Sequence, residues 1–322
     1  MSIQSNTDQA EQSIAIGEAI SEAFSPLFSN FKTAIKFTLL PSISLIVMMG
    51  IGIYFISMIA PNSATIEQEI SPLFFIGQLF FFLLGYLIFC QFYAAWVRFI
   101  FLGENSATET FLLKLNKRHL LLTGKGLLLG IGSYIVFIIV IAIFILAAAL
   151  IFFGGEVLSL QFDNYSPSAI GGMIFLIFPI MLFVMAFFTA IVLKLSYVFP
   201  ATALDEPYSF SMSWAHTKTQ GFKIFISFFV LYLIISFAAG ILMTILGGIF
   251  SVVLFTSGDI FQAENPADIL TSTSTILLVV PLYFGVMIFS LLAMIPFINM
   301  HNYCFATNTG WQSSKEITER FS

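Results

Sequence analysis

The polar residues best placed to do chemistry lie at the end of the last apolar run. Asn299, His301 and Asn302 fall within four positions, and Gln91 and Arg98 lie towards the end of an earlier apolar run. An imidazole, amides and a guanidinium together can line the mouth of a cavity and bind a polar ligand group. The same residue types also form hydrogen bonds between helices at the end of a membrane bundle. Both interpretations are open, and the second is the commoner arrangement.

Two cations near the ends of apolar runs are candidates for binding lipid headgroups. Arg98 and Lys194 have side chains long enough to extend from the edge of an apolar run to the headgroup phosphates. A role in a substrate pathway is the alternative. No Asp or Glu lies deep within an apolar run, and this argues against a proton-coupled pump.

Other signatures of catalysis or metal binding are missing from the sequence. His119, His216 and His301 have no metal-ligand spacing, and no Gly-rich phosphate loop or nucleophile elbow occurs. Cys90 and Cys304 lie in or at the end of apolar runs, as buried thiols do. The sequence therefore predicts no catalytic residue, metal site or cofactor.

The composition indicates which elements must position these residues. Of 322 residues, 59% are apolar and only 9% are charged, whereas soluble domains carry about 25% charged residues. So few charges cannot cover a water-soluble surface, so the chain needs a lipid environment. The net charge of −5 argues against nucleic acid as a partner. Membrane lipids are the expected partners, together with a possible membrane-protein partner.

Six apolar runs are long enough to cross a bilayer as helices, since a span needs about 20 residues. They cover residues 37–59, 74–101, 126–153, 170–198, 224–255 and 276–303. They lack the alternation of polar and apolar residues found in the strands of membrane barrels. The predicted fold is an all-α polytopic bundle of six transmembrane helices.

Basic residues orient these spans. All twelve Lys and Arg lie before the first span, after the sixth, or at the connections between the second and third and between the fourth and fifth. Connections 60–73, 154–169 and 255–275 contain none. Because cytoplasmic loops are rich in Lys and Arg, the pattern predicts that both termini are cytoplasmic. We expect a bacterial inner-membrane protein.

The spans form three hairpins, each preceded by a segment with one apolar face. These segments lie within residues 16–32, 103–125 and 205–223 and suit amphipathic helices in the headgroup plane. The predicted division is a cytoplasmic N-terminal segment (1–36), a six-span membrane domain (37–304) and a cytoplasmic tail (305–322).

The link between the fourth and fifth spans carries a motif of about thirty residues. A Pro ends the span, an acidic pair follows, and a short helix with a Ser-Trp core leads to a Gly before the next span. The motif residues are Pro200, Asp205, Glu206, Ser211, Trp214, Lys218 and Gly221. This link resembles that of a broad bacterial six-span group, which includes YciC-like inner-membrane proteins and the membrane domain of some glycerophosphodiester phosphodiesterases.

The resemblance implies a six-span plan but no activity. In the phosphodiesterases the chemistry belongs to a separate soluble barrel domain, which we do not find in the sequence after residue 304, and the YciC-like group implies no settled activity.

Three functions are therefore carried forward from the sequence. The first is a non-enzymatic membrane module that organises lipid or partner proteins. The second is a transporter or channel for an apolar or amphiphilic cargo. The third is a lipid-modifying enzyme that uses Asp205, Glu206 and His216.

Overall fold

The described part of the chain is helical, with six helices long and apolar enough to cross a membrane. A computed structural model describes residues 14–59, 72–111, 115–153, 167–257 and 273–311. The six long helices are α2 (Phe31–Ile59), α3 (Pro72–Leu102), α5 (Lys117–Phe153), α6 (Pro167–Leu195), α9 (Gly221–Ser257) and α12 (Thr273–Thr309). The predicted all-α polytopic bundle is confirmed.

Some helices continue beyond the predicted apolar runs. α5 begins at Lys117 and α2 at Phe31, whereas the runs begin at 126 and 37. Lys, Arg and Leu are good helix formers, so the backbone stays helical after the sequence ceases to be apolar enough for the hydrocarbon core. Counting apolar residues locates the part that crosses lipid, not the ends of the helix.

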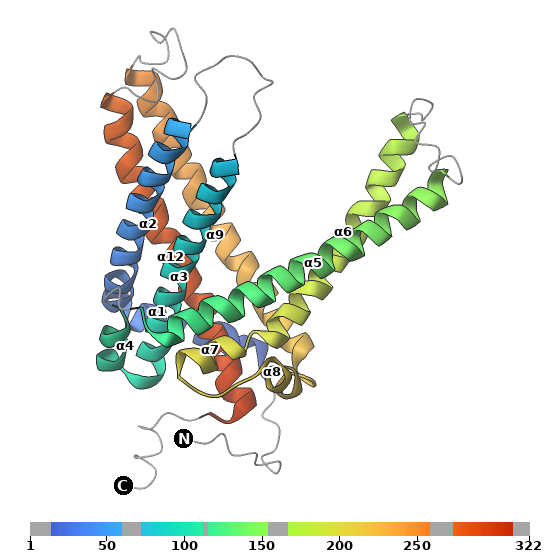
Figure 1. Cartoon of the computed structure of the whole chain (residues 1–322), viewed down its shortest axis with the longest axis horizontal. Coiled ribbons are helices and arrows are strands. Elements are labelled where there is room, and N and C mark those ends of the chain that lie inside the picture. The colour runs from blue at the N-terminus through green and yellow to red at the C-terminus, as the bar shows by residue number, and fades with distance from the viewer. Residues whose placement is uncertain (1–13, 60–71, 112–114, 154–166, 258–272, 312–322) are drawn as a thin grey trace.

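Four short helices lie at one end of the bundle, drawn at the bottom of Figure 1 and called the basal end here. They are α1 (Ile16–Ser29), α4 (Glu104–Phe111), α7 (Val198–Ala203) and α8 (Phe210–His216). α1 precedes the first hairpin, α4 the second, and α7 and α8 the third. This order agrees with the predicted plan of three hairpins.

The short helices differ in detail from the predicted segments. Segment 103–125 is divided, because α4 ends at Phe111 while Leu122 and Lys125 belong to α5. Residues 198–203 form α7, so the fourth span ends at Leu195 and not at 198. α1 buries Ala19 and Ala23, one turn apart, and packs against α12. One face of α1 is therefore covered by protein.

The long helices form two groups that diverge away from the basal end. α2, α3, α9 and α12 stand together, while the α5–α6 hairpin leans away from them (Figure 1). At its base the hairpin is held through contacts of α5 with α3 and α7 and of α6 with α9 and α8. The largest fully buried side chains lie in the basal half: Trp96, Tyr197, Phe37, Phe92 and Phe305. The core therefore lies where all the hairpins meet.

Every Lys and Arg that the structure describes lies at the basal end of its helix or in a basal connection. They are Lys32, Lys36, Arg98, Lys117, Arg118, Lys125, Lys194, Lys218 and Lys223. The helix order thus brings together cations that are far apart in the chain. The predicted confinement of cations to one side is confirmed for these residues, whereas the identity of that side stays a prediction.

We predict that Gly126→Ala loosens the base of the hairpin. A Cβ at Gly126 would lie 1.8 Å from the Tyr86 hydroxyl oxygen on α3, so the ring must rotate or α5 must move away. Overpacking of this kind costs about 1–3 kcal/mol. Gly130→Ala, one turn along the same helix, meets no atom within 4 Å. Thermal unfolding in detergent should show a lower melting temperature for Gly126→Ala only. Equal melting temperatures for the Gly126→Ala and Gly130→Ala variants would contradict this packing.

Candidate functional site

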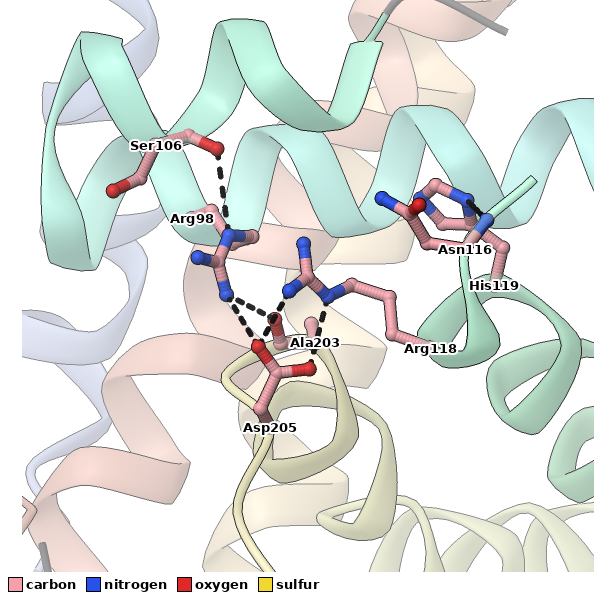
Figure 2. A network of polar contacts seen from close by, with 7 residues as sticks. All are labelled: Arg98, Ser106, Asn116, Arg118, His119, Ala203 and Asp205. Atoms are coloured by element: carbon pink, nitrogen blue, oxygen red, sulfur yellow. Dashed lines mark hydrogen bonds and ion pairs between the residues drawn. The ribbon is translucent and has the colours of Figure 1, made fainter. Parts of the chain in front are cut away.

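An ionic contact joins three segments at the basal end. Asp205, in the connection after α7, accepts hydrogen bonds from Arg118 Nε at 2.9 Å and Nη2 at 2.5 Å, and from Arg98 Nη1 at 3.1 Å. Arg98 also donates to the carbonyl oxygens of Ala203 and Ser106, at 3.2 and 3.4 Å (Figure 2). One carboxylate thus holds the end of α3, the start of α5 and the connection after α7. We call this contact the Asp205 latch.

The backbone at Asp205 has an unusual conformation. Its φ is +63°, in the left-handed region that Asp adopts more readily than most non-glycine residues. The arginine side chains are only 12% and 18% exposed, whereas that of Asp205 is 51% exposed. Charge pairing compensates the partial burial of both guanidinium groups.

Lys125 makes a second contact between the same segments. Its ammonium donates to Thr202 Oγ1 at 2.8 Å and to the Tyr208 carbonyl oxygen at 3.2 Å. Thr202 in turn donates to the Val198 carbonyl oxygen within α7. α5 is therefore joined to α7 and to the start of the link that follows.

Lys194 lies against the Ser-Trp core of the motif. Its Nζ is 4.7 Å from the centroid of the Trp214 ring, a cation–π contact. Its carbonyl oxygen, near the end of α6, accepts hydrogen bonds from Ser213 at 2.6 Å and Thr217 at 3.3 Å. A Cβ at Gly221 would come within 1.9 Å of Lys194 Cε, so this glycine leaves room for the lysine.

The other motif residues surround these contacts. Pro200 is buried within α7, whereas Ser211 and Lys218 are exposed. Glu206 donates its backbone N–H to the Ala201 carbonyl oxygen at 2.8 Å. Headgroup binding by Arg98 and Lys194 stays a prediction.

His301 forms a buried chain of hydrogen bonds. Its Nδ1 is 3.1 Å from the Tyr93 hydroxyl, and its Nε2 is 2.7 Å from Ser196 Oγ. Ser196 also donates to the Leu193 carbonyl oxygen at 2.8 Å. With the Ser196 proton used there, Nε2–H donates to Ser196 and Nδ1 accepts from Tyr93. We call these three residues the His301 chain.

The other members of the predicted polar cluster have different surroundings. Asn299 accepts from Trp96 Nε1 at 2.7 Å and donates to the Ala23 carbonyl oxygen at 2.9 Å, which joins α12 to α3 and α1. Asn302 is 2% exposed, and among the described residues neither of its side-chain polar atoms has a hydrogen-bond partner. Gln91 is buried in α3.

A cavity of about 210 Å³ lies where α3, α5, α6, α9 and α12 meet, and we call it the vertex cavity. Tyr93, Ser196 and His301 all line it, whereas Gln91, Arg98, Asn299 and Asn302 are not among its lining residues. Much of the remaining wall is aromatic, with Tyr86, Phe89, Phe199, Phe228 and Phe297. Of the residues predicted to line a cavity mouth, His301 is therefore the one that lines this cavity.

A larger cavity of about 790 Å³ lies between α5 and α6, and we call it the hairpin groove. Its walls are apolar side chains, except for Ser133 and the backbone at Gly132. On α5 the lining residues run from Leu128 to Phe144, a distance of about 24 Å at 1.5 Å per residue. At the basal end Leu195 and Phe210 complete the lining.

His216 and Tyr208 form a neutral pair near α8. The Tyr208 hydroxyl lies 2.7 Å from His216 Nδ1, and the two rings are stacked. Burial raises the pKa of Tyr208 and lowers the pKa of His216, so both groups are neutral at pH 7. Within the described ranges, no three His, Cys, Asp or Glu side chains are placed to hold a metal ion.

No protein-family model, curated protein or solved structure matches this chain. Its possible roles therefore follow from the geometry above.

Sequence reasoning did not single out three residues that complete these contacts. Ser196 and Tyr93 lie 105 and 208 residues from His301, so no spacing links them. Arg118 was counted only as one of the cations that orient the spans. The sequence did contain one signal for the Asp205 latch. Asp205 lies in a connection on the same side as several cations, so an ion pair with one of them could have been predicted.

We predict that Asp205→Ala lowers the free energy of unfolding by about 2 kcal/mol, because two largely buried arginines lose their shared carboxylate. Asp205→Asn tolerates the left-handed backbone but removes the charge, so it should lose most of the same stability. Glu206→Ala, the adjacent carboxylate, is the control. Chemical or thermal unfolding in detergent measures the difference. If the Asp205→Ala and Glu206→Ala variants unfold alike, the latch does not stabilise the fold.

Proposed function

We propose that this protein is a non-enzymatic membrane protein that binds phospholipid, with an acyl chain in the hairpin groove. The observation that carries the proposal is the size and lining of that groove. Its volume of about 790 Å³ lies within the range of about 300–1,000 Å³ typical of small-molecule sites. An almost wholly apolar lining suits a hydrocarbon chain and offers little to a polar ligand.

The groove has the length and direction that an acyl chain requires. Its α5 wall extends over about 24 Å along a membrane-spanning helix, against a hydrocarbon core of about 30 Å. Phe183 and Phe187 on α6, side chains 74% and 58% exposed, stand beside it. The α5–α6 hairpin leans away from the other long helices (Figure 1), and both of these residues are exposed in the structure.

A cation lies beside the basal end of the groove, where a phosphate would be. Lys194 adjoins Leu195, a lining residue, and its ammonium is held over Trp214 by the cation–π contact. A Lys beside an interfacial Trp is a favourable environment for a headgroup phosphate. This supports phospholipid over an uncharged hydrocarbon.

The basal end faces the cytoplasm of a bacterial inner membrane in this proposal. The confinement of the described Lys and Arg to that end supports this orientation through the positive-inside rule. The link motif supports a relationship to the YciC-like six-span group.

The contacts favour binding over catalysis by the residues named for an enzyme. Both Asp205 carboxylate oxygens accept hydrogen bonds from arginine, so both are engaged within the protein and not directed at a substrate. His216 Nδ1 is engaged by the Tyr208 hydroxyl. A transporter for an apolar or amphiphilic cargo is the second candidate, favoured by the long extent of the groove along α5.

We predict that Gly132→Trp reduces phospholipid retention about tenfold, because an indole in the groove displaces a few buried methylenes worth about 0.8 kcal/mol each. Gly130→Trp is the matched control, since Gly130 is also exposed on α5 but does not line the groove. Native mass spectrometry of protein purified in mild detergent counts the bound lipids. Equal retention by the two variants would contradict the proposal.

A second measurement separates binding from transport. Vesicles containing the protein and a fluorescent phospholipid report movement of lipid between leaflets. Binding alone predicts the spontaneous rate, whereas a faster rate that Gly132→Trp abolishes would favour the transporter.

A further inference from the structure

The vertex cavity combines an apolar body with a single polar wall. Six Phe and Tyr rings line it, together with aliphatic, thioether and thiol side chains, and most of its hydrogen-bonding groups belong to Tyr93, Ser196 and His301. No Asp, Glu, Lys or Arg is among the described residues that line it. A charged ligand group would therefore lose its water without gaining a counter-ion, at high cost. The cavity is suited to a neutral ligand.

The direction of the His301 chain determines what the polar wall offers. Ser196 donates to the Leu193 carbonyl oxygen, so His301 Nε2–H donates to Ser196 and the Tyr93 hydroxyl donates to Nδ1. All three protons are then used within the protein. The groups of this chain that remain for a ligand are the lone pairs on the Tyr93 and Ser196 oxygens. Lone pairs accept hydrogen bonds, so the ligand must donate one.

We propose that the vertex cavity binds a neutral amphiphile that donates one hydroxyl hydrogen bond to the Tyr93 or Ser196 oxygen. A carbonyl ligand bound to the His301 chain would require that chain to reverse, and Ser196 would then lose its bond to Leu193. The volume of about 210 Å³ is below that of sites for whole drug-sized molecules, so it fits a ring or a short hydroxylated end of a longer molecule. The aromatic walls favour a flat ring, which stacks against them.

This site is distinct from the hairpin groove and does not depend on the proposed function. Leu122 on α5, Leu193 on α6 and Ser196 just after α6 line the vertex cavity, and none of them lines the groove. The polar groups also differ, because the groove has only Ser133 for hydrogen bonding.

Two native cysteines provide a direct measurement. Cys90 lines the vertex cavity, whereas Cys304 is fully buried and does not line it. A small neutral thiol reagent, methyl methanethiosulfonate, is applied to the full chain in detergent, and mass spectrometry measures the modification rate of each cysteine. A ligand in the cavity should slow the reaction of Cys90 and leave that of Cys304 unchanged.

Three probes of similar shape separate the hydrogen bond from apolar filling. 4-Pentylphenol can donate, 4-pentylanisole can only accept, and pentylbenzene can do neither. We expect 4-pentylphenol to protect Cys90 at concentrations about tenfold lower than the other two, because one hydrogen bond is worth about 1 kcal/mol or slightly more. Concentrations are compared after correction for partition into the micelles. Ser196→Ala and Tyr93→Phe should reduce this preference, whereas Tyr232→Phe, at an exposed position on α9, should not.

The melting temperature of the same samples gives a second reading if Cys90 reacts slowly. 4-Pentylphenol should raise it more than 4-pentylanisole does. Equal protection and equal stabilisation by all three probes would show apolar filling alone and overturn the proposal. The absence of both effects with 4-pentylphenol would also overturn it. If the preference for 4-pentylphenol persists in both Ser196→Ala and Tyr93→Phe, the phenol hydroxyl does not bind to these two oxygens, and the proposal is overturned.

Discussion

Among the described residues the cations are confined to one end of this molecule, and that constraint shapes the rest of the structure. Hydrocarbon cannot solvate a peptide group, so each crossing segment must satisfy its backbone as a helix. Every described Lys and Arg lies at the basal end, where the largest buried side chains also gather. Away from that end α5 and α6 diverge from the other helices, because their side chains can face lipid as readily as protein.

Several of the polar contacts between helices are made by residues at the interruption that follows α6. The chain leaves the helix after Leu195 and forms α7 and α8 before α9 begins. The carbonyl of Lys194 is satisfied by Ser213 and Thr217, so the interruption leaves this group paired. Ser196 falls at the interruption and reaches His301, while Asp205 follows α7 and reaches two arginines. The interruption and the link after it therefore supply Ser196 to the His301 chain and Asp205 to the Asp205 latch.

The sequence predicted the parts of the fold that depend on hydrophobicity and on charge placement. Six apolar runs and the grouping of cations need only composition and order, so the spans and their common basal end were accessible. Helix ends were not, because Lys117 and Arg118 favour helix as much as the apolar residues after them do. His301 was among the candidate residues, but its partners were not, since Tyr93 and Ser196 meet it only through the packing of α3, α6 and α12. Arg98 also pairs with Asp205, a long-range contact that no local pattern specifies, whereas its predicted binding of headgroup phosphate stays a prediction.

The most direct test of this account is to label the two ends of the bundle from one side of the membrane. Ser211→Cys places a thiol at an exposed basal position in α8, and Pro72→Cys places one at the opposite end, on α3. In intact bacterial cells a membrane-impermeant maleimide should modify Pro72→Cys at once and Ser211→Cys only after the inner membrane is permeabilised. Modification of both positions in intact cells, or of Ser211→Cys alone, would contradict the confinement of the charged end to the cytoplasm.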